Sequence, residues 1–285
     1  MKIFVLSFLI KVYRKIVPKN IRNKIGLRKK MHINENIAKQ LYEYAFGYLK
    51  PNHVKMKFYL KDYVQREIYL TGDYEKDDCF ALLNIFLENG IFLDIGANIG
   101  VYSFVFYKKA KHIYAFEATK KTFDCLCETI EINNIKNITP VFAAVHCRDR
   151  EEIAIYADFP DNCGGNSMHI GYNIANTVMS ITIDNYVLEN DITNIAMIKM
   201  DIEGNELNAF KGMQKTLMKF RPIVFCEINP SASKNAGYNV IELFNYVIDN
   251  CNYLAKIRKN GKYKEIDVKY IGGIQDSINC YFFPK

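Results

Sequence analysis

Short apolar runs alternate with helical patterns through the middle and later parts of the sequence. Five runs have the length and composition of buried strands, at residues 91–95, 113–117, 138–145, 195–200 and 222–228. Apolar positions spaced three or four residues apart predict helices between them, at residues 102–109, 121–133 and 207–220. This alternation predicts an α/β fold with a parallel sheet, helices on both faces and ligands at the carboxyl ends of the strands.

Further elements are predicted on either side of this core. Upstream, the pattern predicts a helix, two strands of a hairpin and a second helix, at residues 34–48, 54–60, 63–69 and 77–89. Downstream, it predicts a helix and two closing strands, at residues 239–251, 254–258 and 279–283. We therefore divide the chain into a basic leader with a helical and hairpin pre-domain, and an α/β domain, at residues 1–70 and 71–285.

The segment from residue 148 to residue 180 interrupts the alternation. It contains a strand-like run at residues 152–157 and a loop at residues 158–166 with one proline and two adjacent glycines. We interpret it as an insertion or lid. Long loops of this kind often carry substrate contacts, although surface decoration is the alternative interpretation. His169 follows this loop and is a candidate for the substrate pocket.

A glycine-spaced turn follows the first strand of the core. Gly96 and Gly100 can adopt backbone angles that other residues resist, and the helix behind them offers free N–H groups. Asp94 lies at the end of the strand that precedes the turn. The next strand ends in Glu117, about 20 residues after the turn, where an acidic side chain binds ribose hydroxyls in nucleotide-binding units.

The spacing of the glycines separates two kinds of cofactor. A dinucleotide fingerprint requires glycine at positions 96, 98 and 101, but positions 98 and 101 are Asn98 and Val101. Close approach of the backbone to a pyrophosphate is therefore disfavoured. S-adenosylmethionine contains a ribose and no phosphate, so it fits this turn better.

Acidic residues concentrate after the fourth strand of the core. Asp201 and Glu203 are two residues apart, so in extended backbone they lie on the same side of the chain. Glu206 follows at the start of the next predicted helix, where an acid also stabilises the helix dipole. We favour a functional role for Asp201 and Glu203.

The positive charge of the chain is confined to its start. The net charge is +7, but ten of the 38 Lys and Arg residues lie within residues 1–30, which leaves 28 against 31 acids. The body is slightly acidic, which argues against a nucleic-acid partner. The leader has an amphipathic pattern too short to span a bilayer. It predicts peripheral contact with an anionic inner-membrane face, or alternatively a helix that packs on the domain or in a dimer.

The cysteines indicate a reducing compartment. The eight cysteines include no Cys-x-x-Cys pair and form no regular framework. Several lie inside apolar runs, as buried reduced thiols do. We therefore expect a cytoplasmic protein.

Four motifs together resemble the FkbM-type methyltransferase family. They are the turn at residues 92–100, the strand end at residues 114–117, the acidic segment at residues 200–206 with the Phe-Lys-Gly at residues 210–212, and the Phe-Cys-Glu-Ile at residues 225–228. The similarity covers roughly residues 71–253. It implies a Rossmann-like, seven-stranded class I sheet that ends in an antiparallel pair. It also implies an S-adenosylmethionine-dependent O-methyltransferase, acting on a sugar of a surface glycan or on a secondary metabolite.

The resemblance implies roles for individual residues. The residues expected to bind the cofactor are Asp94, Gly96, Ala97, Asn98, Gly100, Glu117, Ala118 and Ala144. In an in-line displacement, a carboxylate would accept the proton of the acceptor hydroxyl, and the candidates for this base are Asp201 and Glu203. Further residues expected in the substrate pocket are Glu75, His169 and Glu227. Assistance by Mg²⁺ is an alternative that we do not favour.

Two rival functions remain open. The chain could be a membrane-associated binding or scaffold protein with a vestigial nucleotide fold, or an NAD-dependent dehydrogenase or epimerase. A vestigial fold has no need of both Glu117 and Asp201, and Asn98 with Val101 opposes NAD. The acceptor, the metal requirement and the oligomeric state do not follow from the sequence.

Overall fold

The structure is a computed structural model that describes residues 44–50, 52–157 and 165–285. The chain divides into two compact units, residues 1–44 and 45–285, and nearly all described residues belong to the second unit. The predicted leader lies outside the described residues, as does most of the helix predicted over residues 34–48. No helix among the described residues is long and apolar enough to cross a membrane.

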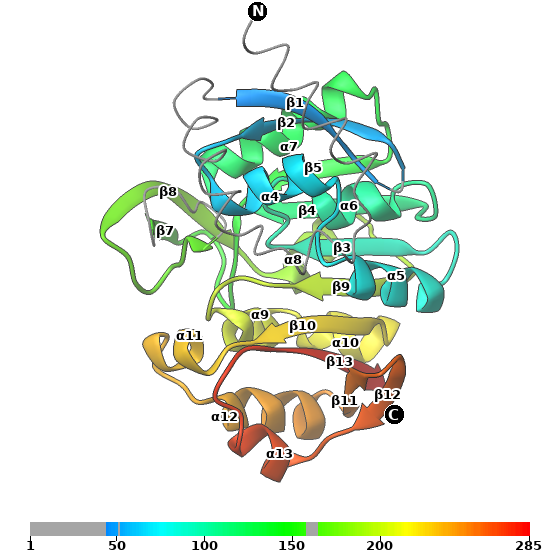
Figure 1. The fold of residues 1–285 in the computed structure, drawn as a ribbon. Helices are drawn as coiled ribbons and strands as arrows, with labels where there is room; N and C mark the ends of the chain where they lie inside the picture. The colour runs from blue at the N-terminus through cyan, green and yellow to red at the C-terminus, as the bar shows by residue number, and fades with distance from the viewer. Residues whose placement is uncertain (1–43, 51, 158–164) are drawn as a thin grey trace, which may run out of the picture. The chain divides into compact units, whose positions relative to one another are not determined.

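An eight-stranded sheet forms the centre of the second unit (Figure 1), in the order β12-β11-β13-β10-β9-β3-β4-β5. In that order its strands span Lys262–Glu265, Tyr253–Lys259, Ile278–Pro284, Ile223–Ile228, Ile195–Met200, Ile91–Ile95, His112–Glu117 and Ile138–Phe142. The strands β5, β4, β3, β9 and β10 are parallel, whereas β13 is antiparallel to its neighbours β10 and β11. The predicted fold class is confirmed, with β12 added at one edge.

The strand β3 lies where the order of the strands reverses. The chain proceeds from β3 to β4 and β5 on one side, and then returns to β9 and β10 on the other side. All five residues of β3 are buried, as expected of a strand covered on both faces. Ligands of such sheets bind in the crevice at the carboxyl ends of the strands beside this switch point.

The helices of the α/β domain are mostly short. They are α5 (Lys76–Ile85), α6 (Val101–Phe106), α7 (Lys120–Ile132), α8 (Ile183–Glu189), α9 (Glu206–Gly212), α10 (Gln214–Phe220), α11 (Pro230–Asn235), α12 (Val240–Asn245) and α13 (Val268–Gly272). The helix predicted over residues 207–220 is instead two helices, α9 and α10, that meet at Met213. The helix predicted over residues 239–251 is α12 followed by the π-helical segment η2 (Tyr246–Asn250).

Two predictions about the segment before the α/β domain are wrong. Residues 44–48 belong to a strand, β1 (Tyr44–Leu49), which pairs with β2 (Val54–Tyr59) in a two-stranded sheet. The second predicted strand of the hairpin is instead a helix, α4 (Tyr63–Thr71). The reason lies in its ends, because Asp62 accepts a hydrogen bond from the backbone N–H of Gln65 and Gly72 closes the helix in a left-handed conformation.

The insertion is built around a second small sheet. Its three strands, in the order β6-β8-β7, span Ala144–Val145, Asn173–Ile181 and Glu152–Ala157. The strand predicted over residues 138–145 is therefore divided, because β5 ends at Phe142 and β6 leaves the main sheet to pair with β8. The strand predicted at residues 152–157 is confirmed as β7, whereas β8 was not predicted.

Candidate active site

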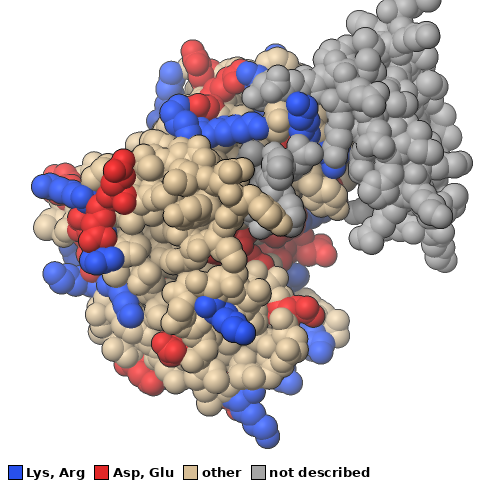
Figure 2. Space-filling model, turned by 90° about the vertical axis from the view of Figure 1, so that its left-hand side faces the viewer, with Lys and Arg blue, Asp and Glu red and all other residues tan. Residues whose placement is uncertain are grey.

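A pocket opens at the carboxyl ends of β3, β4 and β9. This end of the sheet faces the viewer in Figure 2. The lining of the pocket comes from the turn after β3, the segments after β4 and β9, the insertion, and α4 with the segment after it. Most of the residues predicted for cofactor and catalysis lie on it, namely Gly96, Ala97, Asn98, Glu117, Ala118, Asp201 and Glu203. The topology therefore brings together residues that are about 100 positions apart in the sequence.

Gly96 allows the turn after β3 to pass directly beside β9. Its φ is +74°, a left-handed conformation that favours glycine. A Cβ at this position would lie 2.8 Å from the carbonyl carbon of Asp201 and would overlap the carbonyl oxygen. The backbone N–H of Asp201 also donates a hydrogen bond to the carbonyl oxygen of Ile95, at 3.1 Å. The glycine thus places the cofactor turn against the acidic segment.

Glu117 connects the end of β4 to the same turn. One carboxylate oxygen accepts a hydrogen bond from the backbone N–H of Asn98 at 2.7 Å, and the other accepts one from Thr119 at 2.7 Å. Only 8% of Glu117 is exposed, and burial raises the pKa of its carboxyl. The side chain of Thr122 also hydrogen-bonds to this carboxylate. A carboxylate has about four acceptor sites, so Glu117 can also accept a hydrogen bond from a ribose hydroxyl.

Asp94 and Gly100 shape the start of α6 rather than the pocket wall. Asp94 is fully buried, and one of its oxygens accepts hydrogen bonds from the backbone N–H and the hydroxyl of Ser103, at 3.0 and 2.6 Å. Burial raises the pKa of its carboxyl. Gly100 caps the helix with a φ of +88°. Both residues support the turn from the side away from the pocket, and neither lines the pocket.

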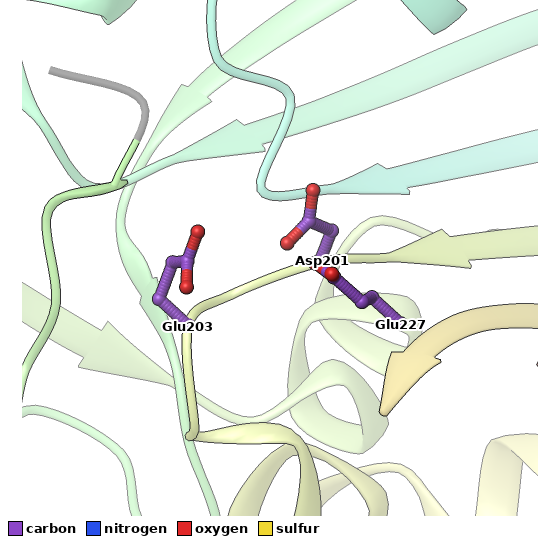
Figure 3. Close-up of side chains that lie close together, drawn as sticks. All are labelled: Asp201, Glu203 and Glu227. Carbon is purple, nitrogen blue, oxygen red and sulfur yellow. The ribbon is translucent and has the colours of Figure 1, made fainter. Parts of the chain in front are cut away.

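Three carboxylates converge at the ends of β9 and β10 (Figure 3). One oxygen from each of Asp201, Glu203 and Glu227 lies within 4.8 Å of the others. Acidic side chains are visible in the recessed middle of the corresponding face in Figure 2. Burial and then the charge of Asp201 raise the pKa of Glu227 to about 7. Glu227 also hydrogen-bonds to Asp201, so a proton on Glu227 would lie between the two carboxyl groups.

Two tyrosines that the sequence did not single out complete the acidic end of the pocket. The hydroxyl of Tyr102 donates a hydrogen bond to Glu75 at 2.6 Å, and burial raises the pKa of the Glu75 carboxyl. Tyr74 lines the pocket, and its pKa is raised by burial and then by the charges of the four surrounding carboxylates, Glu75, Asp201, Glu227 and Glu203. Both tyrosines therefore stay protonated near neutral pH.

Lys199 is another residue that the sequence analysis missed. It lies in β9, two positions before Asp201, and only 5% of it is exposed. Its ammonium donates a hydrogen bond to the carbonyl oxygen of Gly96 at 2.7 Å and lies 3.8 Å from a carboxylate oxygen of Asp201. The signal in the sequence was a single charge inside an apolar strand.

Besides Asp94 and Gly100, the predicted site residues that do not line the pocket are Glu75, Ala144, His169 and Glu227. Ala144 is fully buried in β6 and packs in a small cluster with Ile155 and Val178, whereas its neighbours Ala143 and Val145 line the pocket. Side chains alternate along a strand, so the prediction was displaced by one position. His169 does not line the pocket either. Burial lowers the pKa of its imidazole. Among the described residues of the insertion beyond β7, its neighbours Asn166 and Met168 line the pocket.

Glu206 has a structural task. One of its oxygens accepts hydrogen bonds from the backbone N–H groups of Ile202 and Gly204, both at 3.2 Å, and the other accepts one from the hydroxyl of Tyr238 at 3.1 Å. It is 4% exposed. Glu206 therefore fixes the segment that carries Asp201 and Glu203.

A family model described as the methyltransferase FkbM domain matches residues 94–255, which is more than half of the chain. The chain belongs to the FkbM methyltransferase family. The match includes the glycine turn, Glu117, Lys199 and the three converging carboxylates, so most of the pocket lies within the FkbM domain. Val64, Ile68 and Tyr74 line the pocket from the segment before the match. The resemblance read from the four sequence motifs is confirmed.

Two curated relatives match the FkbM protein. It is 25% identical over 151 residues to the hexuronic acid methyltransferase AglP of Haloferax volcanii, covering 53% of this chain and 61% of that protein. It is 34% identical over 71 residues to an uncharacterised protein of Methanocaldococcus jannaschii, covering 24% of this chain and 27% of that protein. The chain thus spans less than two thirds of the length of either relative.

Solved structures of similar fold include a methyltransferase and a second protein in complex with AdoMet. The FkbM methyltransferase of Methylobacillus flagellatus is 15% identical, with a TM-score of 0.45 over 76% of this chain and 52% of that chain. TYW2 of Methanocaldococcus jannaschii, in complex with AdoMet, is 16% identical, with a TM-score of 0.44 over 86% of this chain and 90% of that chain.

Proposed function

We propose that this protein transfers a methyl group from S-adenosylmethionine to a hydroxyl group of a sugar. The observation that carries the proposal is the position of Asp201. Its carboxylate lies 3.8 Å from the ammonium of Lys199 and hydrogen-bonds to Glu227, and its backbone carbonyl lies directly beside Gly96 of the cofactor turn. A base is therefore available next to the place where a methyl donor would bind.

The pocket has suitable partners for each part of the cofactor. Glu117 would accept a hydrogen bond from a ribose hydroxyl, and the small or apolar side chains of Ala118, Ala143 and Val145 would lie against the adenine. The turn at residues 96–98 would hold the amino acid end, with Asp94 and Gly100 supporting the turn from the side away from the pocket. When bound, S-adenosylmethionine supplies an activated methyl group on a sulfonium, so the protein has to supply orientation and a proton acceptor.

The reaction requires that one bond forms as another breaks. The acceptor oxygen forms a bond to the methyl carbon, the sulfur–methyl bond breaks with its electron pair staying on sulfur, and the hydroxyl proton passes to a carboxylate. Asp201 is the favoured acceptor of this proton, and Glu203 is the alternative on the same segment. Much of the acceleration comes from holding the oxygen and the methyl group close and in line.

A sugar acceptor is supported by the polar end of the pocket. Tyr74 lines the pocket close to the carboxylates of Glu75, Asp201 and Glu227, and all four groups can hydrogen-bond to hydroxyls. The name of the relative AglP, a hexuronic acid methyltransferase, also favours a sugar. A glycan made in the cytoplasm at the inner membrane face would suit the predicted contact of residues 1–30 with anionic lipid. The division at residue 70 also stays a prediction.

Calorimetry tests the cofactor first. We expect the full chain to bind S-adenosylmethionine and S-adenosylhomocysteine, and not NAD. Binding of NAD alone would contradict the proposal and favour the dehydrogenase, whereas binding of none of the three would favour the scaffold protein.

Methyl transfer tests the acceptor and the base. Labelled methyl groups would be followed onto a panel of sugars and uronic acids. Asp201→Asn should lower turnover by about 10²-fold or more, since a positioned base typically contributes 10²–10⁴-fold. Asp249→Asn, an exposed acid on η2, is the matched control. Turnover of the Asp201 variant close to that of the wild type would remove Asp201 from the mechanism.

The same three carboxylates could hold a divalent cation, because Mg²⁺ prefers oxygen ligands. We do not favour this route, since the ammonium of Lys199 and a proton on Glu227 already offset much of the negative charge. Methyl transfer is therefore expected to persist in EDTA. Loss of turnover in EDTA, restored by Mg²⁺, would establish the metal-assisted route instead.

A further inference from the structure

Lys199 is buried in the middle of the sheet, where a lysine is costly. In the parallel pairing of the strands it lies opposite Asp94 of β3 and Phe225 of β10. Its neighbours in β9, Ile198 and Met200, are fully buried. Lysine is almost never fully buried unless it is paired, because its charge must leave water. A buried lysine at this position therefore requires partners that hold its ammonium.

The ammonium of Lys199 has partners on two sides. On the cofactor side, it donates a hydrogen bond to the carbonyl oxygen of Gly96 at 2.7 Å and lies 3.9 Å from an oxygen of Asp94. On the acceptor side, it lies 3.8 Å from an oxygen of Asp201. The ring of Tyr102 covers it, with 5.5 Å between the nitrogen and the ring centroid.

The charge of Lys199 persists in spite of its burial. Burial by itself would lower the pKa of this ammonium, but the carboxylates of Asp201, Asp94, Glu75 and Glu117 outweigh that effect and raise the pKa. A cation is therefore fixed between the turn that would hold the cofactor and the carboxylate that would accept the proton. The carboxylate oxygen of Asp94 that faces the ammonium, Oδ1, has no hydrogen-bond partner among the described residues.

If Lys199 only neutralised the charge of Asp94, the distances around its ammonium would be different. The distance from the ammonium to Asp94 is longer than a hydrogen bond, whereas its hydrogen bond goes to the carbonyl oxygen of Gly96. Lys199 also lines the pocket together with Gly96 and Asp201. Its contacts therefore join two parts of the site that are otherwise held by backbone packing.

We propose that Lys199 is a positioning residue for methyl transfer, which holds the Gly96 carbonyl of the cofactor turn and the Asp201 carboxylate at one point. The inference rests on the proposed function. Lys199 neither gains nor loses a proton in the reaction, because the hydroxyl proton passes to Asp201. Its task is to keep the base at a fixed distance from the methyl group that the turn presents.

Calorimetry with S-adenosylhomocysteine tests the first half of this inference. This probe lacks the sulfonium charge, so its affinity reports the turn and not a direct attraction to the carboxylates. Lys199→Met removes the ammonium and keeps the length of the side chain. We expect the dissociation constant of S-adenosylhomocysteine to rise about tenfold in this variant. Lys199→Arg, which keeps a cation, should recover part of the affinity. Lys262→Met, at an exposed position of β12, should match the wild type.

A double-mutant comparison tests the second half. Asp201→Asn in the wild-type background should raise the same dissociation constant about threefold, because it releases one partner of the ammonium. In the Lys199→Met background the same change should have less than a twofold effect. Equal effects in both backgrounds would overturn the inference, as would wild-type affinity in a folded Lys199→Met variant.

Folding is controlled separately. Lys199→Met leaves the buried carboxylate of Asp94 and the half-buried carboxylate of Asp201 without their cation, so the variant could fail to fold. In that case Lys199→Met is combined with Asp94→Asn, which removes one of these charges, and is compared with Asp94→Asn alone. A tenfold difference between these two supports the inference, and equal affinity overturns it. Failure of the wild type to bind either S-adenosyl compound would instead remove the proposed function itself.

Discussion

Gly96→Ala is the substitution for which the structure gives the clearest expectation. Gly96 has a φ of +74°, and a side chain there would overlap the backbone carbonyl of Asp201 in the neighbouring segment. A backbone carbonyl cannot rotate away as the end of a flexible side chain can. The change should therefore separate the cofactor turn from the acidic segment.

The magnitude has two parts. A left-handed conformation costs a residue with a Cβ about 1–2 kcal/mol relative to glycine. Forcing an extra carbon into a packed interior costs about 1–3 kcal/mol more. Gly237→Ala should show only the cost of the left-handed conformation, because Gly237 has a φ of +84° and nothing lies within 4 Å of an added Cβ. The difference between the two variants, about 1–3 kcal/mol, therefore measures the overlap.

Urea unfolding of both variants, followed by circular dichroism, gives the two free energies of unfolding. Calorimetry with S-adenosylhomocysteine on the folded proteins then shows whether the turn still binds the cofactor product. We expect Gly237→Ala to bind as the wild type does and Gly96→Ala to bind at least tenfold more weakly. Equal stability and equal affinity of the two variants would refute the role assigned to the turn.

Three further variants test other carboxylates of the site. Glu117→Gln should weaken S-adenosylmethionine binding about tenfold by calorimetry, because an amide offers one acceptor where two backbone N–H groups need two, whereas the exposed Glu131→Gln should not. Burial raises the pKa of Glu227 from 4.5 to about 7, so its contribution to stability is complete below about pH 4.5 and is lost as the pH rises through about 7. Urea unfolding at pH 5 and pH 8 should show this loss of stability, on the order of 2 kcal/mol, in the wild type and not in Glu227→Gln. Identical pH dependence of the two proteins would contradict the raised pKa of Glu227. Glu206→Gln should lower the free energy of unfolding by about 1–3 kcal/mol, and Tyr238→Phe by about 1 kcal/mol; no loss in either would exclude a structural task for Glu206.

The parallel core was predictable because its strands are buried on both faces. Apolar runs such as residues 91–95, with Gly90 and Gly96 on either side, are too short for a buried helix. The segment at residues 63–69 was misread because its alternation of apolar and polar residues also fits a short amphipathic helix. Its end signals, Asp62 and Gly72, decide between the two. The small elements α11, α13 and β12 span only a few residues and carry too little periodicity to be recognised.

The acids of the site could be found from the sequence because they follow strands, and the topology of a parallel sheet gathers such positions at one edge. Lys199 and Tyr74 could not be found in the same way. The role of Lys199 depends on which backbone carbonyl and which carboxylates lie within a few ångströms, and the register between β3 and β9 decides this. Tyr74 lies between α4 and α5, and its role depends on carboxylates that are distant in the sequence. The prediction of Ala144 differed from the pocket lining by one position for a related reason. The strand is divided at Ala143, and this division sets which side chains face the pocket.

The position of β13 has a consequence for biosynthesis. This strand comes last in the chain order of the described strands, but it is inserted between β10 and β11. While the ribosome is still translating residues 278–284, the flank of β10 that β13 will occupy has no partner, and β11 cannot dock onto the sheet. The nascent domain therefore exposes an open, aggregation-prone strand edge until translation of this segment is finished.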